Sequence, residues 1–394
     1  MKRASRLISC LAVASSLSAN ASAQSTVNDV IGFLITNQAV QTGERAPDFE
    51  QDRAAAEAAR ATIARALLVN LTSVPLATSS SGFLYRWNPQ LGTVERATES
   101  FGGFFVERAL TSGHGRASFG MSGITSRFNR LDGQDLRDGT LLTTANQFRD
   151  EAAPFDTDAL TLRISSSTLS LFGSVGITDR LEIGGAVPFV SLTVDGRRLN
   201  VYRGAALLQA SGTATASGVA DVAMRAKYTL LATAHGGVAA AAELRLPTGD
   251  KDNLLGAGAA SSRFMGIGSF EHGRLSLHGN MALVRGGVSN ETAFGGAASV
   301  AVHPRVTVAG EVLARRVSEL QDIVLTSAPH ASITGVNTLR LSAGISGAVL
   351  SSAVAGVKWN AAGSLVVGGY VTVPLARRGL TAPVTPTLAL EYAF

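Results

Sequence analysis

Few residues in this sequence have the types and spacing that catalysis requires. Of the 6 histidines, only His278 falls in a stretch where polar and apolar residues alternate, while the others fall in predicted turns or loops. Ser276 lies on the same side of that stretch, so the pair could supply the nucleophile and base of a lipid hydrolase. Same-face neighbours on a strand are about 7 Å apart, and no Gly-x-Ser-x-Gly elbow occurs. We therefore predict that the protein is not an enzyme, with the hydrolase as an alternative.

Acidic residues cluster in two long predicted loops. Asp132, Asp135 and Asp138 form the first cluster, and Asp250 and Asp252 form the second. Carboxylates in loops can bind Ca²⁺, but neither spacing matches that of an EF-hand loop. We predict solvated loops, with no metal site and no cofactor.

A third group of side chains lies on the polar side of several alternating stretches. If these stretches enclose a lumen, charges of opposite sign can pair across it and support the scaffold. The alternative is a wall that selects solutes. Five of the seven charged members are basic, which would weakly favour anions along an aqueous path. The candidate lumen residues are Arg225, Lys227, Glu243, Arg245, Arg274, His278, Glu311 and Arg315.

Strands with one apolar and one polar face must position these side chains. Leu275, Leu277 and Leu283 alternate with polar neighbours, and the same period of two recurs from about residue 80 to the end. Short turns alternate with long loops, which is typical of an all-β, transmembrane antiparallel β-barrel of the outer-membrane type. We predict about 14 strands, within a range of 12 to 16. The predicted strands are 80–88, 100–109, 114–129, 159–177, 181–194, 217–233, 236–247, 261–270, 273–285, 291–302, 304–317, 349–359, 363–375 and 384–394.

The composition and the N-terminus agree with an exported membrane protein. Only 16% of the 394 residues are charged, against about 25% in a typical soluble domain. Residues 1–23 have a basic start, an apolar run and small residues before Gln24, as in a secretory signal. Without the three basic residues of this segment the formal net charge falls from +5 to about +2, so we predict no nucleic-acid partner. The only cysteine, Cys10, lies in the same segment.

The last strand ends in a pattern of alternating large residues. Tyr392 and Phe394 share one face, and a final aromatic on such a strand resembles the recognition signal for outer-membrane barrel assembly. An even number of strands also places both ends of the barrel on the periplasmic side. We predict that the protein lies in the outer membrane of a Gram-negative-type envelope. Its predicted partners are outer-membrane lipids, the barrel-assembly machinery and a small-molecule solute.

Residues 24–79 differ from the barrel, predicted for 80–394, because an alanine-rich helix and a Ser/Thr-rich link replace the alternation. The predicted helix, 48–71, is about 36 Å long, which is comparable to the height of a barrel. It could stand in the lumen as a plug, or lie in the periplasm against the turns or a partner. The plug hypothesis pairs three helix residues with two lumen carboxylates: Arg53, Arg60 and Arg65 with Glu243 and Glu311.

The segment Leu244–Asp250, LRLPTGD, followed by Leu254–Gly258, resembles the motif of the outer-membrane barrel family named after the meta-pathway of phenol degradation. The turn Val357–Asn360 and the C-terminal strand resemble that family too, over roughly 100–394. The loop motif itself consists of Leu246, Pro247, Thr248, Gly249 and Asp250. From the residues alone, Pro247 ends a strand and Gly249 permits a positive φ.

The resemblance implies a function. The family is similar in plan to fatty-acid outer-membrane channels, so the resemblance implies a channel or transporter for small hydrophobic or aromatic compounds. Two alternatives stay open, namely a barrel enzyme such as a lipid hydrolase and a structural barrel without transport.

Overall fold

The computed structural model describes residues 26–36, 47–72, 85–88, 93–96 and 99–394. The signal predicted at 1–23 lies outside these residues.

The two helices are α1 (Val27–Ile35) and α2 (Pro47–Thr72). The strands are β1 (Tyr85–Asn88), β2 (Thr93–Arg96), β3 (Ala117–Phe128), β4 (Arg130–Leu131), β5 (Gln134–Asp135), β6 (Leu141–Phe148), β7 (Asp156–Gly176), β8 (Leu181–Tyr202), β9 (Ala205–Val219), β10 (Val222–Thr233), β11 (Gly236–Leu246), β12 (Ser261–His272), β13 (Leu275–Gly286), β14 (Glu291–His303), β15 (Val306–Pro329), β16 (Val336–Ala362), β17 (Leu365–Pro374), β18 (Leu380–Thr381) and β19 (Thr385–Ala393).

A closed antiparallel ring of 12 strands forms the barrel, in the order β3, β7, β8, β10 to β17 and β19. The strands β6 and β9 join the same sheet outside the ring. The ring closes where β19 pairs with β3, and Ala117 and Phe394 exchange two backbone hydrogen bonds of 3.0 Å. Closure leaves the ring without a free strand edge, which a bilayer requires because lipid offers no hydrogen bonds.

The ring confirms the all-β barrel and lies within the predicted range of strands, but 14 strands was too many. The last twelve predicted strands form the ring, and the first two do not. The strand predicted at 80–88 corresponds to β1, which pairs only with β2 in a separate sheet. The stretch 100–109 is not a strand but lies inside the barrel, where Phe101 and Phe104 are buried. The ring therefore begins at Ala117 rather than near residue 80.

The outer face of the ring is apolar. Leu277 and Val308 point outward and are 43% and 44% exposed, whereas their neighbours Ser276 and Thr307 point inward and are 1% and 0% exposed. Tyr392 and Phe394 also lie outward, with ring centroids 5.6 Å apart. Similar large apolar side chains continue the outward face around the ring: Met121, Leu169, Ile183, Met224, Leu244, Phe264, Met281, Phe294, Val312, Val357, Val371 and Leu388. Such a surface is stable against lipid rather than against water.

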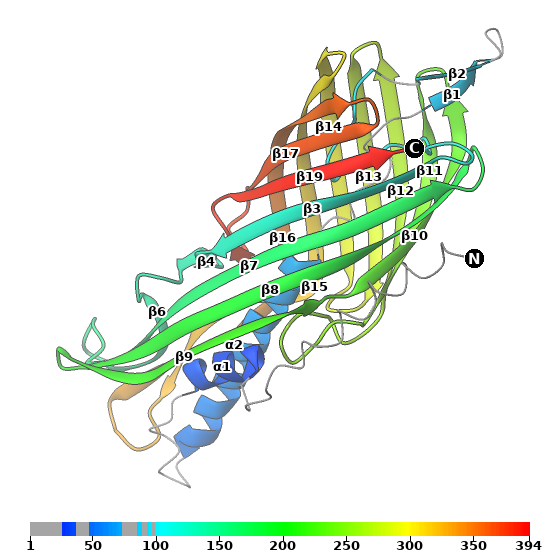
Figure 1. The fold of residues 1–394 in the computed structure, drawn as a ribbon. Helices are drawn as coiled ribbons and strands as arrows, with labels where there is room; N and C mark the ends of the chain where they lie inside the picture. Colours follow the sequence, from blue (N-terminus) through cyan, green and yellow to red (C-terminus); the bar gives the residue numbers. More distant parts are fainter. Residues whose placement is uncertain (1–25, 37–46, 73–84, 89–92, 97–98) are drawn as a thin grey trace, which may run out of the picture.

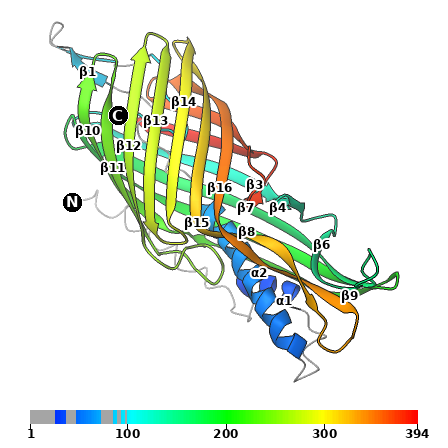
Figure 2. The same cartoon turned by 180° about the vertical axis from the view of Figure 1, so that it is seen from behind.

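Several strands continue far beyond this apolar surface, and their two faces exchange character there. On β7, the outward residue within the apolar surface is Leu169, whereas the outward residue in the extension is Arg163. The inward residues of the extension, Leu162 and Ile164, are buried. The extension consists of β9, β8, β7, β6, β16 and β15 at the end of the barrel away from the C-terminus (Figures 1 and 2). The stretches 195–216 and 318–335, which fall between predicted strands, are therefore mostly strand, and the prediction missed them because the alternation continues there with its phase reversed.

The two helices pack on the inner face of the extension, where α1 contacts β8 and β9, and α2 contacts β15 and β16 (Figure 2). Thr26 and Asp29 form a capping box with two bonds of 3.1 Å at the start of α1. Helix α2 buries an apolar face that includes Ala59, Ile63 and Leu67. Helix and extension thus share one hydrophobic core. Neither described helix is both long and apolar enough to cross a bilayer.

The orientation of β17 can be tested with two adjacent arginine substitutions. Val371→Arg places a charge on the lipid-facing surface and should cost about 2–4 kcal/mol near the bilayer midplane. Thr372→Arg points into an interior cavity and should cost far less. Urea titration of each variant folded in lipid vesicles measures the difference, and equal losses would show that the assignment of faces is wrong.

Deleting Phe394 should reduce the amount of assembled barrel while synthesis continues. The deletion removes the final aromatic and both hydrogen bonds that Phe394 makes with Ala117 where the ring closes. Heat-modifiable gel mobility of membrane extracts reports the assembled fraction, and Leu375→Ala in a loop serves as control. Normal assembly after the deletion would contradict the assembly-signal interpretation.

Candidate functional site

A segment of the chain crosses the barrel interior near the short turns. This crossing segment, residues 99–112, is held by hydroxyl groups of the wall. The Ser100 hydroxyl lies 2.6 Å from that of Ser276, and the Phe101 amide donates to Thr307 over 3.0 Å. Further along, the Ala109 amide donates to Ser269 over 2.8 Å. Small polar residues on the inward face of the strands therefore serve as partners for a backbone that forms no strand.

Charged wall residues hold the same segment. Glu311 accepts hydrogen bonds from the amides of Phe104 and Phe105, the latter at 3.0 Å. Lys358 donates to the carbonyls of Phe101 and Gly103. These bonds matter because an enclosed charge without a partner is costly. Glu311, predicted as a lumen residue, thus contacts the crossing segment rather than open solvent.

Arg225 and Lys227 of β10 act in the same way. Arg225 makes a bidentate pair with Glu107, with one bond of 2.7 Å. Lys227 is fully buried, donates to the Leu110 carbonyl over 3.1 Å and lies 3.7 Å from Glu182. Both predicted residues therefore lie inside the barrel, and each one contacts the crossing segment.

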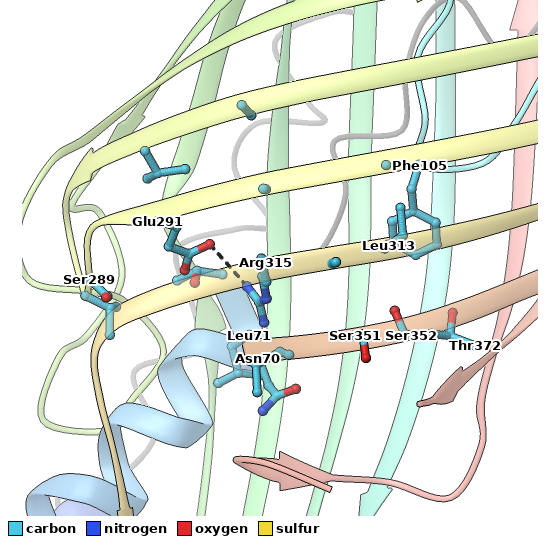
Figure 3. Close-up of a pocket in the computed structure, with 18 of the residues that line it drawn as sticks. Asn70, Leu71, Phe105, Ser289, Glu291, Leu313, Arg315, Ser351, Ser352 and Thr372 are labelled. Atoms are coloured by element: carbon cyan, nitrogen blue, oxygen red, sulfur yellow. Dashed lines mark ion pairs between the residues drawn. The ribbon is translucent and has the colours of Figure 1, made fainter. Parts of the chain in front are cut away.

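A cavity of about 340 Å³ lies between the crossing segment and the C-terminal end of α2 (Figure 3). Phe105 and Leu313 line it near the crossing segment, whereas Leu71 and Arg315 lie near the helix. Its charged wall residues are Glu107, Asp221, Glu243, Arg245, Arg263, Glu291, Arg315 and Arg378. The sequence prediction included Glu243, Arg245 and Arg315. It missed Arg263, although Arg263 lies on the inward-facing side of a predicted strand.

Two wall arginines cap the end of α2. Arg245 donates to the carbonyl of Thr72 over 2.6 Å, and Arg315 donates to that of Val69 over 3.2 Å. The last four carbonyls of a helix lack intrahelical partners and carry its negative partial charge. Each arginine is also paired with a carboxylate, Arg245 with Glu243 at 2.7 Å and Arg315 with Glu291 at 3.5 Å. The barrel wall thereby caps the C-terminal end of α2, whose last turn contains no basic residue.

The ion pairs that the plug hypothesis predicted do not form in the described residues. Arg53 pairs with Glu50 at 3.0 Å, Arg60 pairs with Glu57, and Arg65 donates to the Glu319 carbonyl over 2.8 Å. None of the three reaches the lumen carboxylates Glu243 and Glu311 in the described residues. The physical reason is that α2 meets the cavity with its C-terminal end, which presents carbonyls, so the wall supplies donors instead of acceptors.

Arg274 and His278 occupy different surroundings. Arg274 lies by a short turn, its side chain is 70% exposed, and it is 3.8 Å from Glu99. His278 is buried, and its Nδ1 lies 2.9 Å from the Ser269 hydroxyl. Ser276 bonds to Ser100. In the described residues, Ser276 and His278 therefore each bond to another residue and not to each other. The described residues also contain no group of three or more side chains that could hold a metal ion.

The loop motif Leu246–Asp250 connects the barrel to α1. Thr248 donates to the Ala220 carbonyl over 2.8 Å, and the amide of Gly249 donates to Asp221 over 3.1 Å. Asp250 accepts from the side-chain amide of Asn253 over 2.8 Å, and this bond lowers the pKa of the Asp250 carboxyl. Asn253 in turn accepts from the amide of Val27 over 3.2 Å.

Gly249 is needed for a reason other than the predicted one. It does not adopt a positive φ. Instead, a Cβ there would lie 2.6 Å from the Leu255 carbonyl and 2.7 Å from the Gly256 Cα. Close approach of two loop backbones, rather than dihedral freedom, thus requires glycine at this position.

No protein-family model and no curated protein matches the sequence, so the family resemblance stays a prediction. Among solved structures, the chain is similar to an outer membrane channel from Pseudomonas putida F1, with 13% identity, a TM-score of 0.47, and coverage of 73% of this chain and 98% of that chain. It is also similar to a Pseudomonas aeruginosa FadL homologue, with 8% identity, a TM-score of 0.33, and coverage of 74% and 91%. A third is the Ralstonia pickettii toluene transporter TbuX, with 10% identity, a TM-score of 0.27, and coverage of 72% and 90%. The chain has a closed barrel with a lipid-facing exterior, the fold of outer-membrane proteins.

Removing the caps of α2 should loosen the helix without harming the barrel. Arg245→Gln and Arg315→Gln each remove a charged donor, which we expect to cost about 1 kcal/mol, or roughly a fivefold rise in local opening. Hydrogen exchange of peptides from the last turns of α2 measures this opening. Arg285→Gln, an exposed arginine that donates to the carbonyl of the neighbouring Val284, is the control. Unchanged exchange in both cap variants would show that packing alone holds the helix.

Proposed function

We propose that the protein is an outer-membrane channel or transporter for small hydrophobic or aromatic compounds. The observation that carries this proposal is the cavity inside a closed, lipid-facing barrel, with Phe105, Ile124, Phe128 and Leu313 on its wall. A cavity that places these apolar side chains beside charged and hydroxyl groups suits a small molecule that is largely apolar but carries a polar group. The resemblance of the Leu246–Asp250 loop to the phenol-degradation family supports the same class of cargo.

The N-terminal segment acts as a plug in this proposal. The end of α2 bounds the cavity on one side and the crossing segment bounds it on the other. Solute passage then requires one of these boundaries to move. The α2 boundary is the better candidate, because only its last residues reach the cavity while the crossing segment is bonded to wall residues along its length.

Two alternatives remain distinguishable from transport. A lipid hydrolase needs its nucleophile at the lipid boundary, whereas Ser276 and His278 both point inward. A structural barrel needs no solute path and would show neither conductance nor uptake.

Deleting residues 26–72 while keeping the export signal should raise single-channel conductance in planar bilayers. The deletion removes one boundary of the cavity, so the aqueous path widens. Heat-modifiable mobility must first show that the shortened chain assembles. Unchanged conductance in an assembled deletion would contradict the plug role of α2.

The cargo can be tested in intact cells that lack their general porins. Expression of the full chain should increase the initial uptake rate of radiolabelled phenol at low concentration, with little effect on a disaccharide, which has no apolar ring to pack against the wall. Equal uptake with and without an assembled protein would overturn the transport proposal and favour the structural barrel.

A further inference from the structure

The charged residues of the cavity wall are satisfied with one exception. Glu243 pairs with Arg245, Glu291 with Arg315, and Glu107 with Arg225. Asp221 accepts from the amides of Gly249 and Ala257, and Arg378 pairs with Asp322 at 2.8 Å. Arg263 differs from all of these, because its Nε is buried without a hydrogen-bond partner among the described residues.

Arg263 lies opposite a carboxylate in the strand register, but that carboxylate is bonded to another arginine. Arg263 on β12 lies opposite Glu243 on β11 and opposite Val284 on β13, and Val284 lies opposite Glu291 on β14. The carboxylate of Glu243 attracts Arg263 through space but accepts its hydrogen bond from Arg245. Glu291 is likewise paired with Arg315. Glu243, Arg245 and Arg263 together therefore carry one net positive charge, while the carboxylate of Asp221 on the same wall is bonded to backbone amides.

A guanidinium in this position is suited to a ligand carboxylate. Its planar donors match the two oxygens of a carboxylate, and such charge-assisted bonds are stronger than neutral ones. An incoming anion would also neutralise the charge of this arginine, which lines the cavity.

The rest of the cavity sets the shape of the ligand. Phe105 and Leu313 lie toward the crossing segment, away from the helix cap (Figure 3). Ile124 and Phe128 of β3 add apolar surface. The volume of about 340 Å³ lies at the small end of ligand pockets, which run from about 300 to 1,000 Å³. The space suits one ring with one charged group rather than a long acyl chain.

We propose that the cavity binds an amphipathic organic acid, with its carboxylate on Arg263 and its ring against Phe105 and Leu313. This inference rests on the proposed function, in which the bound acid is the cargo. It narrows the cargo from small hydrophobic compounds to aromatic or cyclic carboxylates.

Fluorine NMR of the purified full chain in detergent tests the site with 4-fluorobenzoate as probe. We expect wild type to bind 4-fluorobenzoate at least tenfold more tightly than 4-fluorobenzyl alcohol, its uncharged counterpart. Arg263→Gln should weaken 4-fluorobenzoate binding about tenfold and leave the alcohol unchanged, and Arg263→Lys should restore part of the loss. Arg274→Gln, an exposed arginine beside a short turn, is the matched control, and protein-free micelles correct for the partition of each probe into detergent.

The outcomes separate the two proposals. If 4-fluorobenzoate and the alcohol bind equally, and Arg263→Gln changes neither, the carboxylate site is overturned while uptake of neutral compounds can still support the channel. If Arg263→Gln and Arg274→Gln weaken 4-fluorobenzoate equally, general surface charge explains binding and the site is overturned. If the site binds 4-fluorobenzoate as expected but the protein speeds the uptake of neither phenol nor 4-fluorobenzoate into cells, the proposed function fails and the ligand is not a cargo.

Discussion

The structure depends on one constraint: polar groups that the barrel encloses must find partners within it. Lipid outside the ring offers none, and a 12-strand ring is too wide for its own side chains to fill. Two other segments of the chain fill the interior: the crossing segment at one end and α2 at the other. Glu311, Lys358, Arg225 and Arg315 each bind backbone or charge from these fillers. Interior charge is therefore mostly structural, and among the charged residues of the cavity wall Arg263 alone has a buried donor without a hydrogen-bond partner in the described residues.

The same constraint explains the reversal of the strand faces. Within the bilayer the outside must be apolar and the inside can be polar. Beyond the apolar surface, the strands are in water on their outer face, so Arg163 faces outward while Leu162 and Ile164 pack against the helices. The extension and the helices form a conventional water-soluble core that is continuous with the membrane barrel.

The ring was predictable because its alternation repeats with one phase. Leu277 outward and Ser276 inward follow from period two alone, and the twelve ring strands were predicted to within a few residues except where they extend. The phase reversal on β8 and β15 hid their extensions, since a strand was expected to end where apolar residues left the outer face. The crossing segment was predicted as a strand, but Phe101 and Phe104, which would lie on opposite faces of a strand, are both buried in the interior.

The candidate site was less predictable for a related reason. Inward charges could be assigned from phase, but their partners are carbonyls and amides that come from segments distant in sequence, such as Thr72 for Arg245 and Phe105 for Glu311. No local pattern shows which inward charge is left over. Arg263 becomes distinctive only when its neighbours are seen to be paired elsewhere.

The central claim is that solutes pass through the cavity between α2 and the crossing segment. The single cysteine of the sequence is Cys10 in the predicted signal, so Thr372→Cys would place one thiol on the cavity wall. Reaction with a bulky methanethiosulfonate during planar-bilayer recording should cut the conductance by more than half, while the same reaction at Ser332→Cys in an outer loop should leave it unchanged. Complete modification at position 372 with unaltered conductance would contradict the claim.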